Sequence, residues 1–154
     1  MASCSTLVED ENMNKNNVIY KIRSIDSNFI NLETLLFVDI DTQSLLHIKK
    51  GTVLKQYSIS SSYYGTGSKE NSLKTPLGRH EIYKKIGNDL PNNAILKGRV
   101  WNGAIADIIV EPLDTDFDHV TSRIMWLDGL EVGKNKGKGI DSRNRYIYIH
   151  GTAE

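Results

Sequence analysis

The stretch "DIDTQSLLHIKKGTVLKQYSISSS" at residues 39–62 holds two apolar runs joined by a short polar turn. The turn is Lys49-Lys50-Gly51, and a glycine between two runs of this kind predicts a β-hairpin. In the second run the side chains alternate between two faces, a period much nearer to that of a strand than to that of a helix. This stretch therefore predicts paired strands and directs the expectation towards a β-rich fold.

Short strand-like runs recur along the rest of the chain, separated by loops rich in glycine and polar residues. Strands are predicted at residues 35–40, 79–86, 94–100, 121–127 and 145–150. The longest loop reads "YYGTGSKENSLKTPLG" at residues 63–78, and an acidic and a basic loop follow at residues 111–119 and 129–139. Helical spacing is loose and confined to Ile22, Ile25 and Phe29. The expected fold class is all-β, a sandwich or barrel with long Gly-rich loops and little helix.

The composition is that of a globular domain without an overall charge. Hydrophobic residues make up 39% and charged residues 25% of the 154 residues, which is sufficient for a packed core. The 19 basic and 19 acidic side chains cancel, so no net field recruits nucleic acid or an acidic membrane. We expect a polar leader of uncertain structure at residues 1–34 and one domain at residues 35–154, without a nucleic-acid partner.

The N-terminus leaves two interpretations of Cys4, the one cysteine of the sequence. No signal peptide is present in the chain as given, because a basic segment followed by an apolar segment is missing. The segment "ASCST" at residues 2–6 matches the end of a lipoprotein signal, whose cysteine receives lipid, but it also fits an ordinary polar tail. The tail is the favoured interpretation. Membrane attachment is expected only if an upstream lipoprotein signal that ends at Cys4 has been lost.

None of the candidate metal and cofactor sites in the sequence has the full set of residues that it requires. Asp114, Asp116 and Asp118 match the first three ligands of a calcium loop, but His119 and Met125 stand where glycine and glutamate are required. The four histidines show no paired spacing of a zinc site. The glycine-rich loops also lack the complete fingerprint of a phosphate or dinucleotide site. We therefore expect neither a metal nor a cofactor.

Three short elements stand in a specific order: "YYGTG" at residues 63–67, "KTPLGRHEI" at 74–82 and "YIYIHGT" at 146–152. The preceding hairpin adds a D-x-x-x-Q-x-L pattern through Asp39, Gln43 and Leu45. Together these elements resemble the L,D-transpeptidase catalytic domain, the YkuD family, over residues 35–154. The resemblance implies an all-β enzyme that cross-links peptidoglycan in the periplasm or cell envelope, with peptidoglycan stem peptides as partners.

The resemblance also implies a chemistry and a set of residues. A cysteine attacks the bond between the third residue of a tetrapeptide stem and its terminal D-alanine, and the acyl group passes to the amine of a second stem. Water as acceptor gives carboxypeptidase activity instead. An isolated histidine at a strand end is usually structural, but the motif order favours a general base at this position. The implied catalytic residues are His150 and Gly151, and the implied substrate-binding residues are Tyr64, Gly65, Thr66 and Gly67.

The sequence departs from the family pattern in one respect. The family's serine–histidine–glycine–cysteine segment, which carries the nucleophile, is absent from these residues. The chain as given is therefore expected to be C-terminally incomplete and inactive. Cys4 is not expected to replace the nucleophile, because a thiol on a polar tail lacks the fixed position that acyl transfer requires. Two alternatives stay open: a non-catalytic module that binds stem peptides, and a remnant without function.

Overall fold

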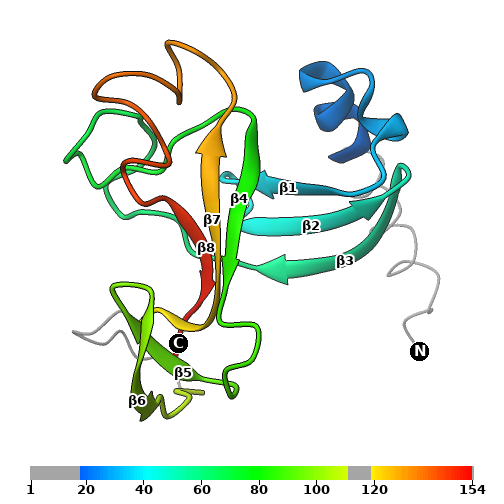
Figure 1. The fold of residues 1–154 in the computed structure, drawn as a ribbon. Helices are drawn as coiled ribbons and strands as arrows, with labels where there is room; N and C mark the ends of the chain where they lie inside the picture. Colours follow the sequence, from blue (N-terminus) through cyan, green and yellow to red (C-terminus); the bar gives the residue numbers. More distant parts are fainter. Residues whose placement is uncertain (1–17, 111–118, 154) are drawn as a thin grey trace, which may run out of the picture. The chain divides into compact units, whose positions relative to one another are not determined.

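The structure is a computed structural model that describes residues 18–110 and 119–153 (Figure 1). The chain divides into two compact units, Met1–Ser61 and Ser62–Glu154. Both units are built on antiparallel sheets and contain few helical residues, which confirms the all-β fold class. The leader at residues 1–34 and the single domain at residues 35–154 stay predictions.

The first unit contains a three-stranded sheet in the order β1-β2-β3. Its strands are β1 (Leu35–Asp39), β2 (Ser44–Lys49) and β3 (Thr52–Ser58). Lys50 and Gly51 between β2 and β3 have φ angles of 47° and 75°, a left-handed turn that glycine adopts without a steric penalty. The hairpin predicted at residues 39–62 is therefore confirmed, with its turn at the expected residues.

A helix over residues 18–25 and the short 3-10 helix η1 (Phe29–Asn31) pack on this sheet. Ile22, Phe29, Leu46 and Ile48 form the buried core between them. Ile25, by contrast, is 62% exposed, because the helix ends at this residue and the chain turns before Phe29. The loose helical spacing seen in the sequence thus reflects two helical segments rather than one continuous stripe.

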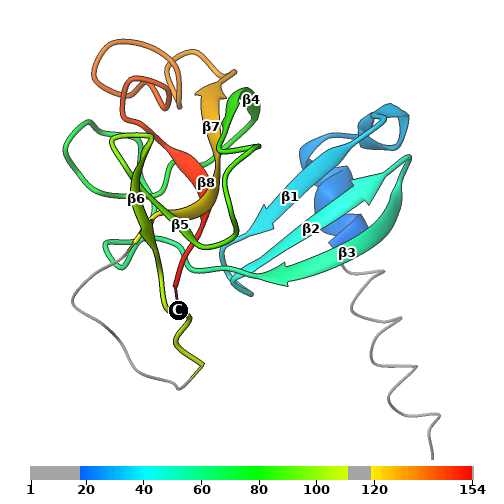
Figure 2. The ribbon, with the colours of Figure 1, turned by 60° about the horizontal axis from the view of Figure 1, so that its bottom comes forward.

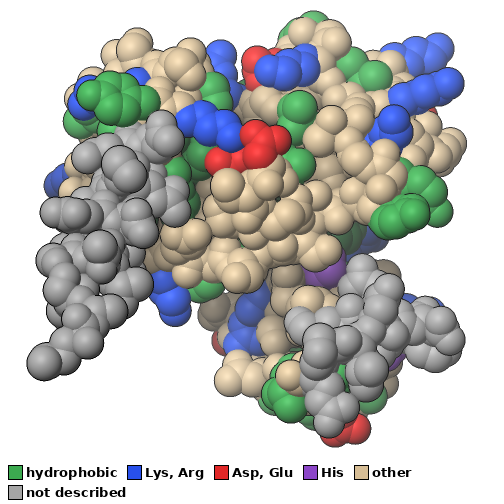
Figure 3. Space-filling model, turned by 180° about the vertical axis from the view of Figure 1, so that it is seen from behind, with side chains coloured by type: hydrophobic (Ala, Val, Ile, Leu, Met, Phe, Trp, Pro, Cys, Tyr) green, Lys and Arg blue, Asp and Glu red, His purple; other side chains and the backbone are tan. Residues whose placement is uncertain are grey.

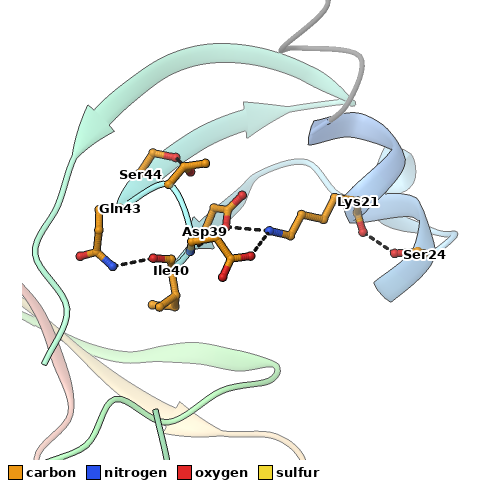
Figure 4. Close-up of polar contacts among 8 residues, drawn as sticks. Lys21, Ser24, Asp39, Ile40, Gln43 and Ser44 are labelled. Carbon is orange, nitrogen blue, oxygen red and sulfur yellow. Dashed lines mark hydrogen bonds and ion pairs between the residues drawn. The ribbon is translucent and has the colours of Figure 1, made fainter. Parts of the chain in front are cut away.

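Lys21 connects the helix to the turn after β1 (Figure 4). Its Nζ atom lies 2.8 Å from Oδ1 of Asp39 and 2.9 Å from Oδ2 of Asp41. Burial disfavours the charged form of Asp39, but hydrogen bonds from Lys21 and from the backbone N–H of Asp41 outweigh it, so the pKa of Asp39 lies below its usual value. The carboxylate of Asp39 is therefore a structural anchor of the first unit.

Gln43 ties this turn to the chain that leaves β3. Its Nε2 donates to the carbonyl oxygen of Ile40 at 2.6 Å (Figure 4). The same Nε2 also lies 2.9 Å from the hydroxyl of Ser61. The backbone N–H of Ser61 donates in return to Oε1 of Gln43 at 2.8 Å. Leu45, the last residue of the D-x-x-x-Q-x-L pattern, is buried. The pattern thus stabilises the turn between β1 and β2 and attaches it to the segment that follows β3.

The second unit contains a five-stranded sheet in the order β4-β7-β5-β6, with β8 also paired to β7 (Figure 2). The strands are β4 (His80–Ile86), β5 (Ala94–Lys97), β6 (Val100–Ile105), β7 (Thr121–Gly129) and β8 (Tyr148–Gly151). The long strand β7 pairs with β4, β5 and β8. It is therefore the element that sets the register of the whole sheet.

Two predicted strands differ from the structure. The strand expected at 94–100 is interrupted after β5, because Gly98 and Arg99 both adopt positive φ angles, 58° and 69°, and form a tight turn into β6. The strand expected at 145–150 begins only at Tyr148, since Tyr146 has a φ of 58°. Left-handed residues interrupt the extended backbone that a strand requires, so both strands are shorter than their apolar runs.

The surface carries charges of both signs close together. On the face seen in Figure 3, basic side chains lie next to acidic ones, in line with the equal numbers of each in the sequence.

Of the helices within residues 18–110 and 119–153, none is long and apolar enough to cross a membrane.

Candidate functional site

His150 lies in β8 of the second unit, directly opposite Ile124 of β7. Tyr148 is opposite Trp126 in the same pairing. Opposed residues, and alternate residues along a strand, share a face of the sheet. His150, Tyr148 and Trp126 therefore lie on one face. Tyr146 lies before β8 and is not part of this alternation.

One nitrogen of the His150 ring is engaged by the backbone. Nδ1 lies 2.9 Å from the carbonyl oxygen of Gly151, and a carbonyl can only accept, so Nδ1 carries the proton. The lone pair of the neutral ring then resides on Nε2. The local backbone thus selects the tautomer that a general base needs, with Nε2 as the proton acceptor.

Gly151 is required by the packing of β8 on β7. A Cβ atom at this position would lie 3.0 Å from Oγ1 and 3.1 Å from the carbonyl oxygen of Thr121. Thr121 is itself fully buried in β7, so it has little freedom to move. The close approach of the two strands therefore accounts for glycine next to His150.

Tyr64, Gly65, Thr66 and Gly67 lie in the loop that precedes β4. The loop is organised by Thr75, whose N–H donates to the carbonyl oxygen of Gly65 at 3.0 Å and whose carbonyl accepts from the N–H of Gly67 at 2.9 Å. The hydroxyl of Thr75 also accepts from the N–H of Ser62 at 3.0 Å. The "GTG" and "TPLG" elements of the sequence are thus two sides of one hydrogen-bonded loop.

Arg145 joins this loop to the segment that leads into β8. Its Nη2 donates to the carbonyl oxygen of Lys74 at 2.7 Å, and its Nη1 to that of Gly67 at 3.3 Å. A further bond runs from the N–H of Glu70 to the carbonyl oxygen of Gly139 at 2.7 Å. The structure therefore connects the loop with Tyr64 to the strand with His150 through Arg145. The sequence offered one sign of this residue, its place directly before the "YIYIHGT" motif.

The basic loop between β7 and β8 is built around Asn135, which is fully buried. Its Nδ2 donates to the carbonyl oxygens of Leu77 and Arg79 at 3.1 and 2.9 Å, and its Oδ1 accepts from the N–H of Glu131 at 2.9 Å. Gly129 leaves room for it, because a Cβ there would lie 2.1 Å from the carbonyl oxygen of Asn135. No local pattern in the sequence indicates this contact, which joins segments more than fifty residues apart.

His80 and Ser142 form a second histidine contact in this unit. The Nε2 of His80 lies 2.8 Å from Oγ of Ser142, and its Nδ1 lies 2.9 Å from the carbonyl oxygen of Gly78. Serine beside histidine is also the arrangement of nucleophilic enzymes. Ser142, however, is fully buried, which keeps a substrate from its oxygen. Burial lowers the pKa of His80, so the neutral ring is part of the structure that holds the basic loop on β4.

Metal binding has little support in the residues described. Within 18–110 and 119–153, no three histidine, cysteine, aspartate or glutamate side chains form a group that could hold a metal ion. Asp114, Asp116 and Asp118 of the calcium-like pattern lie outside these residues, and so does Cys4.

The comparison with protein families decides the identity of the domain. The family model for the L,D-transpeptidase catalytic domain, YkuD, matches residues 33–154. The chain belongs to the YkuD family. This confirms the resemblance seen in the sequence, and an L,D-transpeptidase catalytic domain acts on peptidoglycan. Comparisons with curated proteins and with solved structures gave no match.

All of the predicted site residues lie within the matched YkuD region. His150, Gly151 and the loop at residues 64–67 are contained in the second unit. The roles assigned to these residues stay predictions.

Proposed function

We propose that this YkuD domain binds the stem peptides of peptidoglycan and supplies the general base for L,D-transpeptidase acyl transfer in the cell envelope. The base is His150. The observation that carries this proposal is the bond from Nδ1 of His150 to the carbonyl oxygen of Gly151, because it leaves Nε2 as the proton acceptor on a paired strand.

The reaction requires a thiol next to Nε2 of His150. The imidazole removes the thiol proton, and the thiolate attacks the carbonyl carbon of the third stem residue. The imidazolium then donates the proton to the nitrogen of the departing D-alanine. In the second half, the amine of another stem attacks the thioester and loses a proton to the imidazole. The departing thiolate takes this proton from the imidazolium, which restores the thiol and the neutral imidazole. His150 thus takes and returns one proton in each half-reaction.

The donor stem is proposed to lie along the loop at residues 64–67. The Tyr64 side chain is more than half exposed, and a Cβ at Gly65 would meet nothing within 4 Å. An extended peptide can therefore approach the backbone of Gly65 and contact the ring of Tyr64. Thr66 and Gly67 continue this surface, and Arg145 maintains its shape.

The thiol is not provided by the described residues. Cys4 is the one cysteine in the sequence, and we infer that it is not the nucleophile, because an unpositioned thiol forfeits the advantage of a preorganised site. A polypeptide of these 154 residues should therefore bind stem peptides without releasing D-alanine. Such a polypeptide behaves as a stem-binding domain, which was the alternative interpretation of the sequence.

The test combines binding with turnover. A tetrapeptide stem that ends in D-alanine is titrated into the isotope-labelled polypeptide, and the amide signals of Gly65 and Gly67 and the ring signals of His150 are followed by NMR. His150→Gln and Tyr64→Ala are compared with His47→Gln, which lies in the first unit. Released D-alanine is measured by mass spectrometry for the parent and for Cys4→Ser.

Saturable shifts at Gly65, Gly67 and His150, weakened by Tyr64→Ala and unaffected by His47→Gln, would support the proposal. Absence of binding at millimolar peptide would contradict stem recognition. Release of D-alanine that is lost in Cys4→Ser would contradict the inference that Cys4 is not the nucleophile. Release that survives Cys4→Ser would contradict the requirement for a thiol.

A further inference from the structure

A cluster of aromatic and arginine side chains surrounds Trp126 in the second unit. The ring centroid of Trp126 lies 5.4 Å from that of Tyr83, 5.6 Å from that of Tyr146 and 5.9 Å from that of Tyr148. Because Trp126 and Tyr148 share the face of the sheet that carries His150, the cluster lies beside the proposed base. Its rings come from β4, β7, the segment before β8 and β8 itself.

The cluster borders a shallow hollow of about 290 Å³, lined by Tyr83, Trp126, Arg143, Asn144 and Tyr146. This volume is at the lower end of ligand-binding pockets and suits one small ring system. Tyr83 and Tyr146 are 52% and 55% exposed, so about half of their surface does not pack against other residues. The rings are open to a ligand from solvent.

The polar groups of the hollow also make contacts within the unit. The indole N–H of Trp126 donates to the carbonyl oxygen of Arg143 at 3.0 Å, so Trp126 offers its ring surface and not its donor. The guanidinium of Arg143 lies 5.0 Å from the ring centroid of Tyr83 and 3.6 Å from Oδ2 of Asp128. Asp128 therefore partly compensates the positive charge of Arg143. The remaining N–H groups of Arg143 and the side-chain amide of Asn144 can donate hydrogen bonds to an uncharged ligand.

Arg99 supports the opposite side of the cluster. Its guanidinium lies 4.9 Å from the ring centroid of Trp126 and 4.8 Å from that of Tyr146. Its Nη1 also donates to the hydroxyl of Tyr148 at 3.0 Å. Arg99 is not part of the hollow's lining. It therefore holds the rings of Trp126 and Tyr146 in place, which preorganises them for contact with a ligand.

We propose that this hollow is a subsite for the glycan strand of peptidoglycan. A sugar ring presents C–H groups on its faces, which fit the rings of Trp126, Tyr83 and Tyr146, and hydroxyl and acetamido groups at its rim. Arg143 and Asn144 donate hydrogen bonds to these rim oxygens. This inference rests on the proposed function, since the stem peptide is attached to an amino sugar.

The spacing along β8 matches the length of the stem. Tyr148 and His150 are two residues apart, about 7 Å in a strand. The hollow is lined by Tyr146 and by Trp126, the cross-strand partner of Tyr148. An extended peptide of three residues spans about 10 Å, and the bond to be cleaved follows the third stem residue. A sugar held against Trp126 and Tyr146 thus brings that bond to the neighbourhood of His150.

The decisive experiment compares two ligands that differ only in the sugar. The free tetrapeptide and the same tetrapeptide on its amino-sugar disaccharide are titrated into the polypeptide by calorimetry. We expect the disaccharide form to bind about tenfold more tightly, as stacking on aromatic rings allows. Tyr146→Asn and Tyr83→Ser remove exposed rings, and asparagine tolerates the left-handed backbone of Tyr146. Both should abolish the difference and leave the affinity of the free tetrapeptide unchanged.

Tyr57→Ala in β3 of the first unit is the matched control and should keep the tenfold difference. An oligomer of N-acetylglucosamine without a stem should quench the fluorescence of Trp126 in a Trp101→Phe background. Equal affinity for the two ligands would overturn the glycan subsite and leave stem binding intact. Tighter binding that survives both tyrosine substitutions, or displacement of the sugar oligomer by free glutamate, would also overturn it, the latter by assigning the hollow to carboxylates. Failure of the proposed function would appear separately, as loss of free tetrapeptide binding.

Discussion

The Nη2 atom of Arg145 lies 2.7 Å from the carbonyl oxygen of Lys74, seventy-one residues earlier in the chain. This bond unites the two halves of the candidate site, because Lys74 belongs to the loop with Tyr64 and Arg145 precedes the strand with His150. Burial lowers the pKa of Arg145, but the group keeps its proton at all physiological pH values. Arg145 is thus a charged hydrogen-bond donor to two backbone carbonyl oxygens, those of Lys74 and Gly67, throughout this pH range.

Arg145→Ala should loosen the loop at residues 64–75 without unfolding the sheet. Two hydrogen bonds from a charged donor to backbone carbonyls disappear, together with a longer one to the hydroxyl of Ser72 at 3.5 Å. We expect the unfolding free energy of the second unit to fall by about 1 to 3 kcal/mol. Affinity for a tetrapeptide stem should fall as well. Hydrogen exchange of the Gly67 and Thr75 amides measures the loosening. Arg123→Ala, which removes a guanidinium that donates to its neighbour Ser122, is the control, and equal effects of both substitutions would contradict the role of Arg145.

His80 predicts a pH dependence of stability in the second unit. Its pKa is lowered in the folded state, chiefly by burial, so the unfolded chain binds the proton more tightly. Stability is therefore complete above about pH 6.5 and falls as the pH drops from there towards the folded pKa, by up to about 1.4 kcal/mol per pH unit. Trp101 and Trp126 both lie in the second unit, so tryptophan fluorescence during urea unfolding reports this dependence.

His80→Gln should flatten this slope, because glutamine does not titrate. His47→Gln, in the first unit, should leave the slope unchanged. A slope in His80→Gln as steep as in the parent would show that another group is responsible.

Asn135→Ala should strongly destabilise the second unit. It leaves the carbonyl oxygen of Leu77 and the N–H of Glu131 without this partner and removes one of the two donors to the carbonyl oxygen of Arg79, at a cost of about 2 to 5 kcal/mol in unfolding free energy. Gly129→Ala should act in the same direction, since its Cβ would collide with the backbone of Asn135. Denaturant unfolding measures both.

Gly133→Ala provides the comparison for these two variants. Its Cβ would meet nothing within 4 Å, although its φ of 79° adds some backbone strain. We expect a loss of about 1 kcal/mol. A loss at Gly129 no greater than that at Gly133 would disprove the packing argument.

The first unit should lose stability in acid through Asp39. Its pKa lies below the usual value because the bonds from Lys21 and from the N–H of Asp41 outweigh the effect of burial. The contribution is therefore present above about pH 4 and is lost as the pH falls through the folded pKa. Asp39→Asn should lower the unfolding free energy of the first unit by about 1 kcal/mol at neutral pH. It should also remove the loss of stability in acid. Hydrogen exchange of the β2 amides measures both effects. Asp41→Asn should have little effect, because the Asp41 side chain is 83% exposed. A larger loss of stability in Asp41→Asn than in Asp39→Asn would contradict the role of Asp39.

Local patterns in the sequence determined a large part of this protein. The turn at Lys49-Lys50-Gly51 and the alternation around it predicted the β2–β3 hairpin, since turn chemistry and strand period depend on neighbouring residues. The order of three short motifs identified the YkuD family and directed attention to His150. Strand ends were less well predicted, because the left-handed residues Arg99 and Tyr146 are set by turns that apolar runs do not reveal.

Contacts between distant segments were decided by the tertiary structure alone. The pairing of Trp126 with Tyr148 depends on the register of β7 and β8, and the reach of Arg145 to Lys74 depends on how the loop folds back. A single sequence contains the side chains for such contacts, but it does not state which backbone groups will lie within hydrogen-bond distance. That is settled when the sheet forms and each strand takes its neighbours, because register and burial are properties of the packed chain and not of any one segment.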